Sequence, residues 1–123
     1  MNEFRVEGME SLLQEIEQLG PKGARIENQA LKETGETVRQ AIQAEVPRRT
    51  GTLERSITVS RVKTAGGQKH VEVGPDKNGW YGKFVEFGTV KMKANPFMAR
   101  GYESSKDRAM EIIQSELRKG LGL

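Results

Sequence analysis

The sequence predicts an α+β fold, with N-terminal helices, a small antiparallel β-sheet that contains a hairpin, and a long C-terminal helix. Apolar residues recur at helical spacing in the first and last thirds of the chain. The middle third contains runs of β-branched residues separated by runs of turn-forming residues. A chain of 123 residues fits one domain with its own core. We therefore expect a single domain with a helical part (1–46), a sheet and aromatic segment (47–95) and a C-terminal helix (96–123).

The N-terminal part predicts two helical stretches. The first has apolar residues at helical spacing from Met9 to Leu19, and Gly20-Pro21 ends it. The second keeps apolar residues on one face until Pro47 closes it. Gly35 lies inside this second stretch and costs up to about 1 kcal/mol relative to Ala. The second stretch is therefore either one helix or two.

The middle part predicts a β-hairpin. The run Arg48-Arg49-Thr50-Gly51-Thr52 is typical of a turn, and β-branched residues follow it over 57–62. The turn-forming run Ala65-Gly66-Gly67-Gln68 separates this strand from a second one at 69–74, where apolar and polar residues alternate. We expect the two strands to pair in an antiparallel hairpin.

Residues 80–87 form a short aromatic element that Gly88 ends. A helix would place Tyr81, Phe84 and Val85 together, whereas a strand would place Tyr81, Lys83, Val85 and Phe87 on one face. We expect a helix, because it buries fewer charges. The last helix is expected from Pro96 to about residue 119, since Pro suits a first turn and apolar residues follow at core spacing until Gly120.

Charge is unevenly distributed along the chain. The net charge is +3, but residues 1–46 hold nine Glu against five Lys and Arg, so this part carries −4 and the rest carries +7. Two stretches without acidic residues lie between Glu54 and Glu72 and between Glu86 and Glu103. They predict two basic surfaces, which suit either a phosphate backbone or an acidic face of a neighbouring copy, although each single residue is also typical of a solvated loop.

Few residues suit catalysis or a bound metal. The chain has no Cys, its only His is His70, and its only Asp residues are Asp76 and Asp107. They give no nucleophile–base pair, no metal-ligand set and no Gly-rich phosphate loop. We therefore expect no enzyme activity, no metal and no cofactor.

Membrane insertion and export are also not expected. No apolar run approaches the roughly 18 residues that a membrane helix needs. The run Met1-Asn2-Glu3-Phe4-Arg5 lacks the basic-then-apolar order of a signal peptide. The sequence predicts a cytoplasmic product.

Four short runs, in order along the chain, carry a family resemblance. They are Pro47-Arg48-Arg49-Thr50-Gly51-Thr52-Leu53-Glu54-Arg55-Ser56-Ile57, Val71-Glu72-Val73-Gly74, Tyr81-Gly82-Lys83-Phe84-Val85-Glu86-Phe87-Gly88-Thr89 and Asn95-Pro96-Phe97-Met98. With these runs the chain resembles the small tail-component and head–tail joining (tail completion) family of long-tailed phages and prophages. Each run alone is common, but four in this order and at these separations are fairly specific.

The resemblance implies a non-catalytic structural protein of the virion, acting in tail completion or head–tail joining. It implies assembly in the host cytoplasm, then a place in the tail or neck. The implied partners are other copies of the chain, as a ring, and other tail or head–tail connector proteins. DNA is a further candidate partner, and contact with it is not expected to be sequence-specific. The alternative function is a small basic nucleic-acid-binding domain, whose phosphate contacts would be Arg48, Arg49, Arg61, Lys63, Lys91 and Lys93.

Subunit contacts are expected in the basic loops and the aromatic segment. The candidate interface residues are Arg48, Arg49, Thr50, Gly51, Arg55, Trp80, Tyr81, Phe84, Glu86, Phe87, Lys91 and Lys93. Glu86 stands between Val85 and Phe87, where an unpaired buried carboxylate would be costly. We expect an arginine, Arg48, Arg49 or Arg55, to pair with it within the chain or across subunits. The resemblance leaves open whether Lys91 and Lys93 meet DNA, a tail tube or a neighbouring subunit.

Overall fold

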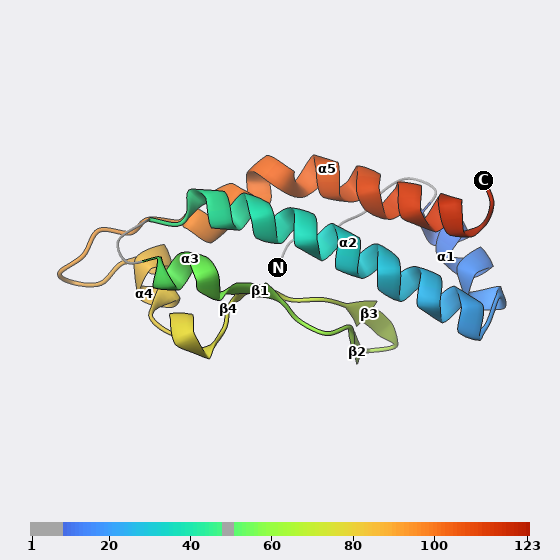
Figure 1. Ribbon diagram of the computed structural model, residues 1–123, viewed down its shortest axis with the longest axis horizontal. Coiled ribbons are helices and arrows are strands. Elements are labelled where there is room, and N and C mark those ends of the chain that lie inside the picture. The colour runs from blue at the N-terminus through green and yellow to red at the C-terminus, as the bar shows by residue number, and fades with distance from the viewer. Residues whose placement is uncertain (1–8, 48–50) are drawn as a thin grey trace.

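The computed structural model describes residues 9–47 and 51–123 and confirms the α+β class. Two long antiparallel helices, α2 (Pro21–Glu45) and α5 (Phe97–Gly120), pack side by side along the long axis of the molecule (Figure 1). A short helix, α1 (Met9–Gln18), packs against both helices at one end. The other end holds α3 (Thr52–Ser56), the 3-10 helix η1 (Lys77–Gly79) and α4 (Gly82–Phe87).

Helix α2 continues through Gly35, so the second predicted stretch is one helix. Gly35 is buried where the β-hairpin region (residues 57–75), called the ribbon below, crosses the helix. A Cβ at Gly35 would lie 2.8 Å from Cγ1 of Val59 and 3.1 Å from Cγ2 of Val71. The glycine thus lets the ribbon approach the helix closely, which accounts for a residue that weakens the helix locally.

The predicted hairpin is confirmed, but it is divided into two ladders. Strand β1 (Ile57–Val59) pairs with β4 (Val73–Pro75), and β2 (Lys63–Ala65) pairs with β3 (Gln68–His70), both antiparallel. Gly66 and Gly67 have φ angles of 59° and 78°, as a two-residue hairpin turn requires. Between the ladders, the amide of Glu72 donates to Oγ of Ser60 at 2.8 Å, which keeps the strands together.

One short helix was not predicted from the sequence. Residues Thr52–Ser56 form α3, where only a turn leading into a strand was expected. Gly51 enters this helix with a φ of 80°, and Leu53 within it is buried. This single turn of helix places Leu53 against the core.

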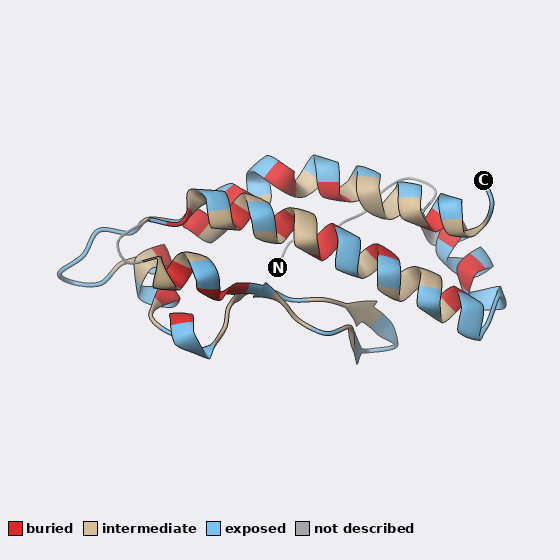
Figure 2. Cartoon of the chain, viewed as in Figure 1, coloured by how far each residue is buried: buried red, intermediate tan, exposed pale blue. Residues whose placement is uncertain are grey.

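The core consists of two clusters, which lie toward opposite ends of the α2–α5 pair (Figure 2). The cluster at the α4 end contains Val38, Ile42, Val46, Leu53, Ile57, Phe97 and Ala109. The cluster at the α1 end contains Ile16, Ala30 and Leu117. At Gly101 a Cβ would lie 2.4 Å from Cα of Ile42, so α2 and α5 touch through their backbones. Across 9–47 and 51–123, no helix combines the length and apolar character that crossing a bilayer needs.

Candidate interaction surface

The end of the molecule that contains α3 and α4 brings together all four runs that carry the family resemblance. Leu53 from the first run and Phe97 from the fourth are buried in the same cluster. Val73 from the second run and Tyr81 and Val85 from the third pack against it. These residues are up to about 45 positions apart in the chain. Much of the motif pattern therefore specifies how this end is packed.

Two glycines allow the α4 region to pack closely against α3 and β4. A Cβ at Gly79 would lie 2.1 Å from Oγ of Ser56, and one at Gly82 would lie 2.9 Å from Cγ of Pro75. The carboxylate of Asp76 accepts the amide of Asn78 at 2.8 Å and so begins η1. These close contacts fix one side of α4 to the rest of the protein and leave its other side to solvent.

Helix α4 confirms the helical interpretation of the aromatic segment, and it divides the aromatic residues between two sides. Tyr81 packs toward the core, whereas Trp80, Phe84 and Phe87 lie at helical spacing on the outer side. Trp80 is 67% exposed and Phe87 is 77% exposed. The Trp80 and Phe84 rings meet edge to face at 6.1 Å, and Nζ of Lys83 lies 5.2 Å from the centroid of the Phe84 ring. The outer side of α4 therefore carries an aromatic stripe next to the ammonium group of Lys83.

A tight turn after α4 presents a further apolar side chain. Gly88 has a φ of 77°, and the amide of Thr89 donates to the carbonyl of Met92 at 2.8 Å. Oγ1 of Thr89 accepts the amide of Lys91 at 3.2 Å. Val90 stands at the tip and is fully exposed, at 105%. Figure 1 shows this connection between α4 and α5 projecting from the end of the molecule.

We define the α4 surface as the exposed apolar residues of this end together with the lysines among them: Trp80, Lys83, Phe84, Phe87, Val90, Lys91, Met92 and Lys93. A cavity of about 490 Å³ opens beside it between α3, α4 and the turn. Its wall includes Leu53, Tyr81, Val85 and Met92, so it is largely apolar. Several large apolar side chains exposed on one end of a molecule are typical of a protein–protein contact.

Glu86 is buried, at 6% exposure, and backbone amides are its partners among the described residues. One carboxylate oxygen accepts the amide of Met98 at 2.8 Å and the other accepts the amide of Ala99 at 3.2 Å. Both amides belong to the first turn of α5, where N–H groups lack partners within the helix and a negative charge is favoured. Glu86 therefore caps α5.

Within the chain, the expected ion pair between Glu86 and Arg55 is not formed. Among the described residues, no ion pair joins Arg55 to Glu86. Arg48 and Arg49, with Thr50, lie outside the described residues. The backbone amides of α5 already satisfy both oxygens of the carboxylate, so an arginine is not required to offset its burial.

The structure brings together five of the candidate interface residues, namely Trp80, Phe84, Phe87, Lys91 and Lys93, on the α4 surface. Gly51 lines the cavity beside this surface, and Arg55 is exposed on α3. The sequence analysis did not select Lys83, Val90 and Met92. In the sequence, Val90 is an apolar residue in a basic turn. Its exposure can be recognised only when the positions of α4 and α5 are known.

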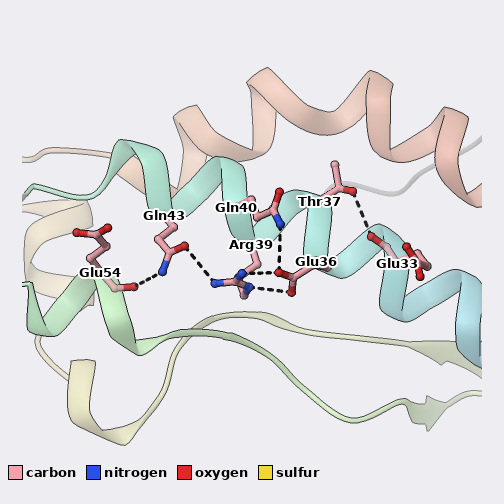
Figure 3. Close-up of polar contacts among 7 residues, drawn as sticks. All are labelled: Glu33, Glu36, Thr37, Arg39, Gln40, Gln43 and Glu54. Carbon is pink, nitrogen blue, oxygen red and sulfur yellow. Dashed lines mark hydrogen bonds and ion pairs between the residues drawn. The ribbon is translucent and has the colours of Figure 1, made fainter.

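A polar chain supports α3 from the side of α2 (Figure 3). Arg39 donates to both carboxylate oxygens of Glu36 and, at 3.2 Å, to Oε1 of Gln43. Nε2 of Gln43 in turn donates to the backbone carbonyl of Glu54 at 3.0 Å. The guanidinium beside it lowers the pKa of Glu36, and the carboxylate raises the pKa of Arg39. This chain links α2 to the helix whose Leu53 lines the cavity.

The second basic region lies on the ribbon, apart from the α4 surface. Lys63 pairs with Glu72 at 3.3 Å and lowers the pKa of that carboxyl, and Lys69 donates to Oδ1 of Asn28 at 3.0 Å. In Figure 1 the β2–β3 hairpin and the turn after α4 lie at different positions along the long axis. Among the described phosphate contacts of the nucleic-acid alternative, Lys63 on the ribbon thus lies apart from Lys91 and Lys93 beside α4. Within the described ranges, His, Asp and Glu form no group of three or more suited to a metal ion.

Comparison with protein families gives a match described as "Bacteriophage HK97-gp10, putative tail-component", over residues 10–88. The match covers more than half of the chain, from α1 through the ribbon to the end of α4. Neither the curated proteins nor the solved structures yield a match. The chain belongs to the HK97-gp10-like family of bacteriophage tail components.

Proposed function

We propose that this protein completes the phage tail or joins it to the head, through protein–protein contacts of the α4 surface and without catalysis. Its partners in this proposal are other copies of itself and neighbouring tail or connector proteins. It assembles in the host cytoplasm and then stays in the tail or neck of the virion. Family membership supports the tail role, and the α4 surface supports the contacts.

The exposure of the α4 surface is the observation that carries this proposal. Trp80, Phe84, Phe87, Val90 and Met92 are all exposed large apolar residues, and they lie on one end of the molecule. Removal of such side chains from water is favourable by about 25 cal/mol for each Å², and this term opposes the entropic cost of association. Aromatic residues and Met are also enriched at the centres of protein interfaces.

The surface is held in place before any partner binds. Gly79 and Gly82 fix α4 against its neighbours, Glu86 ties α4 to the start of α5, and the amide of Asn95 donates to the carbonyl of Val85 at 2.8 Å. A preorganised surface loses less conformational entropy on binding than a loose one. This rigidity suits a protein that must join other virion proteins in one geometry.

Deletion of the gene from its phage or prophage tests the role. After induction, we expect negative-stain electron microscopy to show separate DNA-filled heads together with unattached or malformed tails. Normal infectious virions would overturn the structural role and favour the nucleic-acid alternative, for which steeply salt-dependent DNA binding is the measurement.

Complementation with surface variants tests the contacts. Phe87→Asp places a charge in the α4 surface, whereas Ser115→Asp places the same charge at an exposed position of α5. Both variants should keep the wild-type circular dichroism spectrum, because both positions are exposed. We expect only Ser115→Asp to restore infectious particles in the deletion strain, and equal complementation by the two variants would contradict the role of the α4 surface.

A further inference from the structure

The cavity between α3, α4 and the turn after α4 has an apolar wall that continues to the protein surface. Leu53, Tyr81 and Val85 form the part of the wall that adjoins the core. Phe84 and Met92 also line the cavity and are 40% and 42% exposed. A volume of about 490 Å³ is within the range of sites that enclose a ligand. The cavity therefore suits a bulky apolar side chain of a partner, which would lose its contact with water there.

Positive charge surrounds the cavity. Lys93 lines it and is the charged residue among the described lining residues. Nζ of Lys83 lies 5.2 Å from the ring centroid of Phe84, and Lys91 is exposed next to Met92. Within the described part of the chain, no ion pair involves any of these three lysines. Their charge is thus available to a partner.

The nearby acidic residues do not cancel this charge. Glu86 is buried, and both of its carboxylate oxygens accept amides of α5. Glu45 pairs with Arg100 at 3.0 Å. Glu54 in α3 is half-buried and does not belong to the cavity wall. The site therefore combines an apolar interior with net positive charge at its mouth.

From this combination we propose that the cavity binds a short acidic segment of another virion protein. One bulky apolar side chain of the segment fills the cavity, and its carboxylates meet Lys83, Lys91 and Lys93. The apolar anchor provides most of the affinity, and the opposite charges steer the encounter and exclude basic partners. This inference rests on the proposed function and adds the chemistry of the partner.

The acidic residues of this chain suit the cavity poorly, so a second copy is not the expected occupant. Four glutamates already pair with an arginine or lysine of the same chain, namely Glu36, Glu45, Glu72 and Glu103. Glu15 and Glu17 are two positions apart in α1, so they lie on different sides of the helix and do not face one site together. A two-fold contact through the cavity would set the three lysines against the same three lysines, which is unfavourable.

Selection from a library of short random peptides on the purified protein tests the chemistry of the site. We expect the enriched peptides to combine one Trp, Phe or Leu with several Asp or Glu. Enrichment of basic or uncharged peptides, or no enrichment above the library, would overturn the proposal.

A pair of variants with equal changes of net charge locates the binding. Selection on Lys91→Glu with Lys93→Glu should lose the preference for acidic peptides. Selection on Lys22→Glu with Lys119→Glu should keep it, because these exposed lysines lie at the α1 end of the molecule. Equal enrichment of acidic peptides on the two variants would contradict the role of the lysines beside the cavity.

Fluorescence anisotropy with an enriched peptide separates the anchor from the charges. Replacement of the bulky residue of the peptide by Ala should weaken binding by about tenfold or more. Lys91→Glu with Lys93→Glu should also weaken it by about tenfold. This second loss should shrink at high salt, because exposed charges are screened. Binding that depends on neither change would overturn the proposal.

An NMR titration with the same peptide shows whether the cavity itself is occupied. The largest changes in amide chemical shift are expected at Leu53, Val85 and Met92, which line the cavity. Changes centred on another part of the molecule would contradict the cavity as the binding site.

Photo-cross-linking in assembled particles identifies the natural occupant. Met92 at the rim is replaced by the photoreactive residue benzoylphenylalanine, and Ser115, exposed on α5, is replaced in the control. After irradiation, mass spectrometry should find position 92 joined to an acidic segment of another virion protein, and position 115 not joined to it. A cross-link from position 92 only to this same chain or to a segment without acidic residues, or no cross-link from it, would overturn the proposal.

The inference and the proposed function can fail separately. Loss of the acidic preference in the peptide selection would remove the inference and leave the tail role intact. Normal virions after deletion of the gene would instead remove the proposed function, while the peptide measurements on the purified protein would still report on the cavity.

Discussion

The two ends of the α2–α5 pair are built in different ways. At the α1 end, Ile16, Ala30 and Leu117 form a small core from regular helices. At the α4 end, residues from α2, α3, β1 and α5 form a larger core, to which closely packed glycines and the buried Glu86 are added. The first end needs little beyond apolar residues at helical spacing, whereas the second depends on particular residues at particular contacts.

This difference indicates where specific sequence is required. Short irregular segments cannot satisfy their polar groups by helical hydrogen bonds alone, so the α4 end needs Asp76 for η1 and Glu86 for α5. The same contacts fix the position of the exposed apolar residues at this end. The runs that carry the family resemblance gather here for both reasons.

The largest expected effect separates the two ends by core truncation. Phe97 and Ile16 are both fully buried, one in each cluster. Phe97→Ala should lower the free energy of unfolding by about 3–5 kcal/mol and Ile16→Ala by about 2–4 kcal/mol, as measured by urea denaturation followed by circular dichroism. Phe97 contacts a cluster that joins four elements, so its loss should weaken the whole protein.

Hydrogen exchange shows whether the ends are independent. After Ile16→Ala we expect faster amide exchange in α1 with little change in α4, because α1 packs mainly against the α2–α5 pair in the described structure. Uniform acceleration at both ends would contradict the division of the core into two parts.

A smaller effect is expected from the cap on α5. In Glu86→Gln one of the two acceptor oxygens becomes an NH₂ group that faces a backbone N–H of α5. We expect this change to lower the free energy of unfolding by about 1–3 kcal/mol, the range for a lost bond to a charged group together with an unsatisfied buried donor. Urea denaturation provides the measurement.

Glu103→Gln is the matched control for Glu86→Gln. Glu103 lies on the exposed side of the same helix and, among the described residues, pairs with Lys106, one turn away, at 2.9 Å. Its replacement should cost no more than about 0.5 kcal/mol. Equal losses from the two variants would show that Glu86 does not stabilise the start of α5.

Much of the fold follows from local patterns in the sequence. Helical spacing and Gly20-Pro21 predict α1 and α2, Gly66-Gly67 predicts the hairpin, and Pro96 predicts the start of α5. Each of these signals acts within a few residues of its effect. The α4 helix was predicted in the same way, from the spacing of its apolar residues.

Contacts between distant segments could not be predicted in this way. Gly35 signalled a weak point in a helix, but its role depends on Val59 and Val71 of the ribbon. Glu86 signalled a missing positive partner, and arginines were the visible candidates. Its partners among the described residues are backbone amides, which every residue except Pro carries and which therefore leave no mark in the sequence. The exposed side of α4 was likewise undefined until its buried side was known.

The smallest expected effect concerns the polar chain that supports α3. Arg39 holds the pKa of Glu36 below its ordinary value of 4.5, so the pair stabilises the folded state above that pH. The carboxylate is 46% exposed, and solvent screening limits the contribution to about 0.3–0.5 kcal/mol at neutral pH. Glu36→Gln should lose this amount at pH 7, and the difference from wild type should vanish as pH falls through the lowered pKa.

Glu33→Gln is the control, because Glu33 lies on the same helix and accepts a hydrogen bond from Gln29 rather than from a cation. Its replacement should change stability less than Glu36→Gln at pH 7. A loss in Glu36→Gln that persists at low pH would rule out the charged pair as its cause. Since Arg39 also holds Gln43, which donates to the carbonyl of Glu54, the loss should appear as faster hydrogen exchange in α3 and not in α1. That pattern would show that the Glu36–Arg39 pair, in the middle of α2, stabilises the α4 end of the molecule.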